Sequence, residues 1–303
     1  MRPDDVVGVA VPATSANLGP GFDAFAVALD LHLTVWTTDR EDRRVVAGGA
    51  GAEELPTGDD NLVWQALLAY CERFGAGVPD VSLAADNGIP LERGMGSSAA
   101  AAVAGVALGR ALTGAGGRDR DLIELAARLE GHPDNAAAAV LGGLVVCHGG
   151  TVTRLDPTDR LRPVLCVPLA RQSTAAARGL LPASVPLADA AANGARAAVV
   201  LAGLAGAVAW DPTAMRDVLH EPARLGAMAR SGALVAALRD AGVGACLSGA
   251  GPAVLAVVPS GGEDAVTRAA AGVPDFEVRP ARWDRAGAVA CPPTVLPGGG
   301  PRR

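Results

Sequence analysis

The 303-residue chain contains no lysine, so all 26 of its basic residues are arginines. A Walker A phosphate loop needs a Gly-Lys-Ser/Thr core, and a Schiff-base enzyme needs a lysine amine. Both kinds of site are therefore excluded. A phosphate-binding loop in this protein has to work through backbone amides, hydroxyls and a metal ion.

The chain also lacks an excess of positive charge, paired cysteines and long apolar runs. Its 32 acidic residues against 26 basic ones give a formal net charge of −6, which argues against broad nucleic-acid or membrane-surface binding. The five cysteines are widely spaced and contain no CxxC pair, which is typical of reduced thiols. No signal-peptide pattern follows Met1, and apolar runs such as 99–108 are too short to span a membrane. We therefore expect a soluble, cytoplasmic protein.

Length and pattern indicate a two-domain α+β protein. A chain of 303 residues with 50% hydrophobic residues is long enough for two closely packed domains. Predicted strands and helices mix without strict βαβ alternation, which favours α+β over a doubly wound sheet. The polar, proline-flanked segment 156–163 is the best candidate for a domain boundary.

Several elements can be placed by periodicity. The apolar run 6–12 predicts a strand that ends in a polar loop, and residues 25–38, with partial alternation, predict a long strand or a bent pair of strands. Asp59 and Asp60 are expected to cap a helix with an apolar stripe. Further helices are predicted at 97–112, which is nearly all Ala, Val and Leu, at 119–130, and at about 187–208 and 224–240; two strands are expected within 245–258.

The sharpest motif is Gly94-Met95-Gly96-Ser97-Ser98, which leads directly into the apolar helix. A helix start offers unpaired N–H groups, and glycines let the backbone approach an anion closely. Three other interpretations fit the same residues. They are a relaxed dinucleotide fingerprint (Gly94-x-Gly96-x-x-Ala99), an incomplete hydrolase nucleophile elbow around Ser98, and a plain serine-capped helix.

Three further segments combine glycines with polar side chains. The first, PATSANLGPGFD at 12–23, carries Asn17 and Asp23, which suit a polar substrate or an ordinary Asx turn. The second, EGHPDN at 130–135, offers a carboxylate suited to Mg²⁺, although His132 would also fit a transition metal and Asp134 a helix cap. The third, CLSGAGP at 246–252, is a glycine-rich turn between two strands.

Together and in this order, these four segments resemble the motifs of the GHMP small-molecule kinase superfamily. Within it, the forms at 12–23 and 130–135 are most similar to those of the homoserine kinase family. Two additional matches are Ser173-Thr174-x-x-Ala177-Arg178-x-x-Leu181-Pro182 and Glu221-Pro222-x-Arg224. The resemblance covers roughly residues 6–283. Met95 departs from it, since leucine is usual there, but that exchange is a tolerant one.

The resemblance implies the GHMP kinase fold. We expect an N-terminal ribosomal-S5-domain-2-like domain at 1–158 and a ferredoxin-like C-terminal domain at 159–291, with the active site in the cleft between them. Residues 292–303 form a Pro/Gly-rich tail that we expect to be disordered.

The implied reaction is transfer of the γ-phosphoryl group of ATP to the side-chain hydroxyl of L-homoserine, which gives O-phospho-L-homoserine for threonine biosynthesis. The expected ligands are ATP, Mg²⁺ and L-homoserine. A homodimer is expected, without nucleic-acid or membrane partners.

The resemblance also implies residue roles. The ATP phosphates would be surrounded by Pro90, Gly94, Met95, Gly96, Ser97, Ser98, Ala99 and Ala100. Ser98 and Glu130 would hold Mg²⁺. Homoserine would contact Asn17, Asp23, Asn135, Thr174, Arg178, Arg224 and Gly249. Asp23 suits the substrate ammonium and arginine suits its carboxylate.

The catalytic residues implied are Asn135, Glu130 and Ser98. Several GHMP relatives have a carboxylate base where this chain has Asn135, and a neutral amide cannot accept a proton. Catalysis would then rest on alignment and charge stabilisation, which suits a loose phosphoryl-transfer transition state. Asp23 as a base stays open.

Competing functions are a mevalonate or sugar kinase, a non-catalytic sensor of the same fold and, more remotely, a dehydrogenase. Arg178 and Arg224 argue against a sugar kinase, because a sugar has no carboxylate to engage two arginines. Ser98 and Glu130 argue for turnover, because a sensor need not retain metal ligands.

Overall fold

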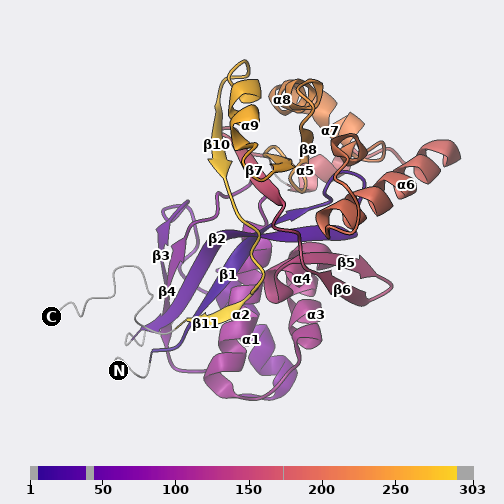
Figure 1. Ribbon diagram of the computed structural model, residues 1–303. Coiled ribbons are helices and arrows are strands. Elements are labelled where there is room, and N and C mark those ends of the chain that lie inside the picture. The colour runs from indigo at the N-terminus through magenta and orange to yellow at the C-terminus, as the bar shows by residue number, and fades with distance from the viewer. Residues whose placement is uncertain (1–5, 39–43, 173, 292–303) are drawn as a thin grey trace.

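The computed structural model describes residues 6–38, 44–172 and 174–291 (Figure 1). These residues form two sheets and the helices around them. The first half of the chain contains β1 (Gly8–Ala16), β2 (Phe25–Thr38), β3 (Val45–Gly49), α1 (Leu62–Phe74), β4 (Ser82–Asn87), α2 (Ser97–Thr113), α3 (Asp119–Glu130), α4 (Pro133–Leu141), β5 (Leu144–His148) and β6 (Thr151–Leu155). The second half contains β7 (Leu161–Pro168), α5 (Thr174–Gly179), α6 (Leu187–Leu204), the 3₁₀ turn η2 (Pro212–Met215), α7 (Glu221–Ala227), α8 (Ala229–Asp240), β8 (Gly244–Leu247), β9 (Val254–Pro259), α9 (Glu263–Ala270), β10 (Phe276–Pro280) and β11 (Val289–Cys291).

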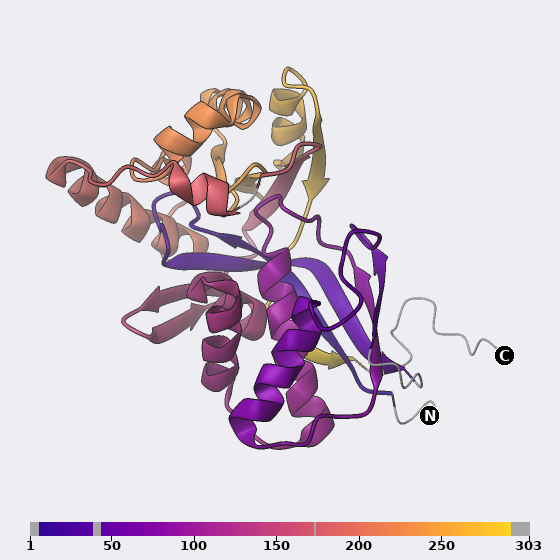
Figure 2. The same cartoon turned by 180° about the vertical axis from the view of Figure 1, so that it is seen from behind.

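The N-terminal sheet is organised around the 14-residue strand β2. The strand order is β11-β1-β2-β4-β3, and β5 and β6 continue from the other end of β2. The β3–β4 pair is parallel and the remaining pairs are antiparallel. Helices α1 to α4 lie together beside this sheet in both views (Figure 2). One sheet and one helical layer therefore enclose the larger core.

Helix α2 lies at the centre of that layer, because its small residues allow close approach. A Cβ on Gly105 would overlap the Val63 carbonyl oxygen, and one on Gly109 would lie 2.7 Å from the Tyr70 ring. From Ala102 to Gly109 every residue is buried. The expected helix buried on all sides is thus confirmed for its middle.

The C-terminal sheet has the order β10-β7-β9-β8, with every pair antiparallel. Numbered within the domain this is 4-1-3-2, and helices separate the first strand from the second and the third from the fourth. That arrangement is the ferredoxin-like βαββαβ unit. Helices α8 and α9 bury Leu234, Leu238 and Val266 against it. The predicted α+β class is confirmed, and so is the ferredoxin-like half.

The chain crosses between the two sheets twice. Residues 156–160 link β6 of the first sheet to β7 of the second, while 161–163, the rest of the predicted boundary segment, already belong to β7. After β10 the chain returns, and β11 pairs with β1 in the N-terminal sheet (Figure 1). The division into 1–158 and 159–291 stays a prediction, with the qualification that 289–291 joins the first sheet. The tail 292–303 lies outside the described residues.

Local differences from the predicted elements have simple causes. Strand β1 continues past residue 12 to Ala16, because a register shift after Pro12 lets residues 13–16 pair with 26–29 of β2. The cap of α1 is Asn61, whose side chain accepts the Val63 N–H, and not Asp59 or Asp60. The predicted helix 224–240 is two helices that break at Met228.

Helix α6 projects from the molecule in both views (Figures 1 and 2). By length and composition it is the one helix in the described ranges that could cross a membrane, and 22% of it is buried within the protein. A single helix of this kind is weak grounds for a membrane span.

Candidate active site

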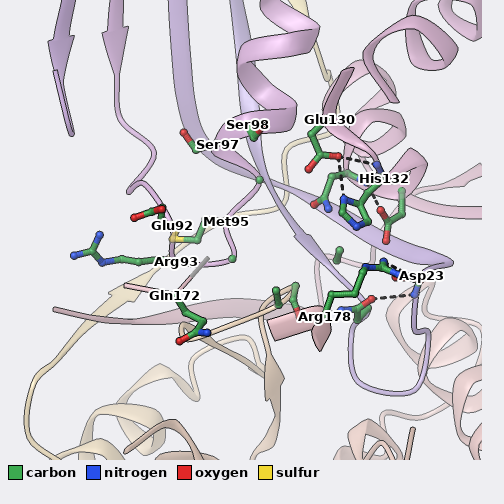
Figure 3. A pocket seen from close by; sticks show the side chains of 18 of the residues that line it. Asp23, Glu92, Arg93, Met95, Ser97, Ser98, Glu130, His132, Gln172 and Arg178 are labelled. Carbon is green, nitrogen blue, oxygen red and sulfur yellow. Dashed lines mark hydrogen bonds and ion pairs between the residues drawn. The ribbon is translucent and has the colours of Figure 1, made fainter. Parts of the chain in front are cut away.

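The four glycine-rich motifs meet in one cleft of about 220 Å³ between the two sheets (Figure 3). Its walls are formed by Ala16, Asn17, Asp23, Pro90, Glu92, Arg93, Gly94, Met95, Gly96, Ser97, Ser98, Glu130, His132, Asp134, Asn135, Gln172, Arg178, Arg224, Gly249 and Ala250. In Figure 3, Ser97 and Ser98 lie at the start of α2, Glu130 and His132 lie to one side, and Asp23 and Arg178 lie below.

The loop before α2 depends on two glycines in the left-handed region. Gly94 has φ 73° and Gly96, which directly precedes the helix, has φ 68°. A Cβ at Gly94 would overlap the Ser248 carbonyl oxygen, and one at Gly96 would overlap the Thr14 hydroxyl. Only glycine tolerates both the positive φ and the close neighbouring atom without strain. The loop therefore presents the start of α2, with its unpaired N–H groups, to the cleft.

Hydrogen bonds join this loop to two other motifs. The Thr14 N–H donates to the Met95 carbonyl at 3.1 Å, and the Ser248 hydroxyl donates to the Gly94 carbonyl at 2.7 Å. The Gly249 N–H donates to the Ala16 carbonyl at 3.1 Å. Motifs more than 230 residues apart in sequence are thus hydrogen-bonded to one another at the base of the cleft.

Glu130 and His132 occupy the turn between α3 and α4. The Glu130 Oε2 accepts the His132 N–H at 3.0 Å and lies 3.5 Å from His132 Nδ1. The Glu130 carboxylate is the main cause of a raised pKa for His132. No group of three or more His, Cys, Asp or Glu in the described ranges is arranged to hold a metal by itself, so the alternative transition-metal site gains no support.

Asp134 and Asn135 open helix α4. The Asn135 Oδ1 accepts the Thr14 hydroxyl proton at 2.7 Å, which fixes the amide at the cleft wall. Asp134 is buried, and its carboxylate accepts the Asn135 N–H at 2.8 Å. Burial, with the nearby Asp23 carboxylate adding to it, raises the pKa of Asp134 to about 6. The capping role considered for Asp134 from sequence is wrong, because the N-cap of α4 is His132 and Asp134 lies inside the first turn, where it lines the cleft.

The opposite wall is built by the loop at 17–23. Asn17 has φ 70°, donates its side-chain N–H to the Gly249 carbonyl at 2.8 Å and accepts the Asp23 N–H at 3.0 Å. The Asp23 carboxylate receives Arg178 Nη2 at 3.0 Å on both oxygens. Both side chains of this ion pair are nearly half exposed, so a ligand can reach them.

Arg224, on α7, is the second cation of this wall and is buried. Its guanidinium lies 3.1 Å from His220 Nδ1, 3.4 Å from the Gly249 carbonyl and 5.5 Å from the centre of the Phe22 ring. In the described part of the chain it forms no ion pair, and burial lowers its pKa. Arg224 is therefore a desolvated cation that faces the cleft without a direct ion pair, and the carboxylates of Asp23, Asp217 and Glu221 act on it from a greater distance.

Most of the predicted site residues line this cleft. Ala99 and Ala100 do not, because they are buried in the first turn of α2. The structure describes the backbone of Thr174 at the start of α5 but not its side chain. The site roles themselves stay predictions.

The structure adds lining residues that were not predicted: Ala16, Glu92, Arg93, His132, Asp134, Gln172 and Ala250. Arg93 donates to the carbonyls of Pro168 and Leu169, and so fastens the loop to the second sheet. Arg93 directly precedes Gly94 in the glycine-rich loop, and this position was the sequence feature that could have indicated it. Gln172 follows β7 and had no sequence signal.

Comparison with known proteins agrees with this architecture. Residues 61–143 match the model for the GHMP kinase N-terminal domain, and residues 209–274 match the one for the C-terminal domain. The homoserine kinase of Streptomyces avermitilis is 42% identical over 273 residues, which cover 87% of this chain and 89% of that protein. The homoserine kinase of Streptomyces coelicolor is 40% identical over 300 residues, 96% of this chain and 94% of that protein.

Among solved structures, the homoserine kinase from Cytophaga hutchinsonii superimposes with a TM-score of 0.83 at 26% identity, and covers 95% of this chain and 98% of its own. The expected GHMP kinase fold is confirmed. With relatives near 40% identity along most of its length, the chain belongs to the homoserine kinase family of the GHMP kinases.

Proposed function

We propose that this protein transfers the γ-phosphoryl group of ATP to the side-chain hydroxyl of L-homoserine. The observation that carries the proposal is the pairing, on one wall, of the buried unpaired guanidinium of Arg224 with the accessible carboxylate of Asp23. An amino acid carries one charge of each sign on adjacent groups, so its carboxylate can pair with Arg224 while its ammonium shares Asp23 with Arg178. A sugar or a neutral alcohol would leave Arg224 without an ion-pair partner.

In this arrangement the substrate carboxylate binds Arg224, with Arg178 as the more exposed second cation. The ammonium binds Asp23, whose bond to Arg178 is nearly half exposed and can rearrange. The Asn135 amide, held by Thr14, is proposed to orient the hydroxyl that attacks. Asn17 and Gly249 support the same wall through their mutual hydrogen bond.

The ATP phosphates are proposed to bind at the start of α2, where Gly94, Gly96, Ser97 and Ser98 expose backbone N–H groups and hydroxyls. A second cavity, of about 420 Å³, shares Ser97 and Ser98 with the cleft. Its other walls are mostly apolar and include Val45, Ala47, Leu55, Pro56, Leu62 and Val63. Because it continues from the phosphate site and is apolar, it suits the nucleoside.

The residues available for Mg²⁺ fit that ion. Mg²⁺ prefers oxygen ligands and is held in kinases by one or two carboxylates together with substrate phosphates. Glu130 supplies a carboxylate that His132 holds in place, and Ser98 supplies a hydroxyl at the phosphate site. Mg²⁺ bound there would neutralise the charge that develops on the phosphates.

The chain aligns the reactants. Asn135 cannot accept the hydroxyl proton, since its group is a neutral amide. Asp23 and Asp134 are the carboxylates beside it, and Asp134, with a pKa of about 6, is largely ionised at neutral pH. As the homoserine oxygen bonds to the γ-phosphorus, the bond from that phosphorus to the β,γ-bridging oxygen breaks and ADP leaves. In a loose transition state the hydroxyl proton leaves late, to the Asp23 carboxylate or to water, so positioning by Asn135 and Arg224 dominates.

We also propose a cellular location, the classes of partner that do not bind, and an oligomeric state. A cytoplasmic location is supported by the five free cysteines, which suit a reducing compartment. The absence of nucleic-acid and membrane partners rests on the net charge of −6. A homodimer is proposed on the family resemblance.

The test is a coupled ADP-release assay with homoserine, threonine, serine, mevalonate and galactose. We expect homoserine to have the highest kcat/KM, and activity to require Mg²⁺. Faster turnover of mevalonate or galactose would refute the assignment.

A further inference from the structure

We propose that His220 is a positioning residue that selects for the substrate carboxylate by holding Arg224 against the 17–23 loop. The inference rests on the proposed function, because it assigns a role within the homoserine site. It concerns a residue that does not line the cleft and that the motifs did not single out.

His220 is buried and hydrogen-bonded on both ring nitrogens. Nδ1 lies 3.1 Å from Arg224 Nη1, and Nε2 lies 3.1 Å from the Gly19 carbonyl oxygen. Arg224 belongs to the C-terminal half of the chain, and Gly19 belongs to the loop that carries Asn17 and Asp23. One imidazole therefore bridges the proposed carboxylate-binding cation and the loop for the ammonium.

The two contacts define the state of the ring. A guanidinium can only donate, so Nδ1 must accept, and the Gly19 carbonyl can only accept, so Nε2 must carry the proton. The ring is then the neutral Nε2–H tautomer. Burial lowers the pKa of His220, which favours the same neutral form.

The groups around the ring hold it in this orientation. Phe22 stacks on it at 5.0 Å between centres and 26° between planes, and the same ring lies under Arg224. The charged neighbours are Arg224, Asp217 and Glu221. The Asp217 Oδ2 accepts the backbone N–H groups of residues 219, 220 and 221. Glu221 is engaged by Arg239 and the Leu247 N–H. Asp217 also faces the ring, because its Oδ2 lies 3.7 Å from His220 Nε2, and its buried Oδ1 has no hydrogen-bond partner in the described structure. Neither acid forms a hydrogen bond or ion pair with Arg224 there, so His220 is the side-chain hydrogen-bond partner of Arg224.

Asn193 provides a matched comparison. Its side chain donates to the Pro20 carbonyl at 2.9 Å and accepts the Val218 N–H at 3.1 Å, so it joins the same loop to the same segment. Asn193 has no hydrogen bond with Arg224 in the described structure. Loss of Asn193 should loosen the loop without removing the acceptor of the arginine.

The experiment compares three variants on two substrates, L-homoserine and 3-amino-1-propanol, which lacks only the carboxylate. His220→Asn keeps an acceptor near the Nδ1 position. His220→Gln keeps a donor near the Nε2 position but removes the acceptor for Arg224. Asn193→Ala is the control. Each variant is checked by thermal unfolding, and ATP KM is measured beside the substrate KM.

We expect His220→Gln to raise the homoserine KM roughly 10-fold while changing the ATP KM and the kcat/KM for 3-amino-1-propanol by less than about 2-fold. His220→Asn should have a homoserine KM close to that of the wild type. Asn193→Ala should affect both substrates by similar factors, because it acts through the loop.

Equal losses on both substrates in His220→Gln, or a His220→Asn variant as poor as His220→Gln, would overturn the inference. If the wild-type protein fails to phosphorylate homoserine, the proposed function falls and the inference with it. If it does phosphorylate homoserine but the variants lose both substrates alike, only the role of His220 is refuted.

Discussion

Replacing Arg224 with methionine tests the substrate assignment most directly. Arg224 is buried, lacks an ion pair in the described structure and faces the cleft. If it binds the homoserine carboxylate, Arg224→Met removes a charged hydrogen bond from a desolvated site. Such a bond contributes roughly 1.5–3 kcal/mol, or about 10–150-fold in kcat/KM. The loss should appear mainly in the homoserine KM, with the ATP KM nearly unchanged.

The stability of the variant should move in the other direction. A buried guanidinium without a counter-ion pays a desolvation penalty that a methionine of similar length does not. We therefore expect the midpoint of thermal unfolding of Arg224→Met to equal or exceed that of the wild type. Arg230→Met is the control, because Arg230 is 62% exposed and pairs with Asp275 on the surface. It should change kcat/KM less than about 2-fold.

The assay is steady-state ADP release with homoserine and 3-amino-1-propanol on both proteins. In the wild type, kcat/KM should fall by about the same factor when the substrate carboxylate is removed as it falls when Arg224 is replaced. The variant should lose little more when both are absent, because the two changes delete the same interaction. If the carboxylate deletion lowers kcat/KM by the same factor in both proteins, Arg224 does not bind the carboxylate.

Three other predictions follow from the site. Glu130→Gln should lower kcat more than it raises the homoserine KM, because a metal-bound charge acts on developing negative charge; an unchanged kcat at saturating Mg²⁺ would remove Glu130 from the metal site. Asp134→Asn should flatten the pH dependence of unfolding. The raised pKa of Asp134 stabilises the fold below about pH 4, and that contribution, roughly 3 kcal/mol, is lost as the pH rises to about 6; parallel stability curves for variant and wild type would contradict this. Gly96→Ala should raise the ATP KM and lower the unfolding midpoint, because its Cβ would overlap the Thr14 hydroxyl; Gly77→Ala, at a glycine whose Cβ meets open space, is the control.

The sequence alone was sufficient to predict which chemical groups the glycine-rich loops carry. Gly94 and Gly96 mark a backbone that needs positive φ, and the hydroxyls of Ser97 and Ser98 follow directly, so the anion cradle is encoded within five residues. The conjunction of four motifs identified the family, because their order along the chain is far more specific than any one of them. Helix 119–130 was predicted with correct bounds, since its apolar residues fall on one face. Residues 25–38 alternate only partly and predicted a long strand or a bent pair, and the structure has one strand with those bounds.

Other features were decided by contacts between distant segments. His220 is a local neighbour of Arg224 at i−4, but Phe22, which lies against both side chains, comes from a loop about 200 residues earlier, and no spacing rule relates that loop to Arg224. Strand β11 exists only because β1 offers it a free edge, so a proline-rich end of the sequence gave no strand signal. The prediction of 224–240 as one helix was wrong because Met228 adopts a non-helical backbone between α7 and α8.

Asp134 shows most clearly what the sequence determined and what the tertiary structure decided. Its sequence neighbours allowed a helix cap as one interpretation, but the N-cap of α4 is His132 and Asp134 lies in the first turn. Its pKa of about 6 comes from the surrounding protein, which excludes water, and from Asp23, which lies 111 residues earlier in the chain. Sequence determines which groups a segment carries and how its backbone turns, because those depend on near neighbours. Solvent exclusion and charge proximity arise only when distant segments pack, so the tertiary structure alone decides which of those groups become reactive.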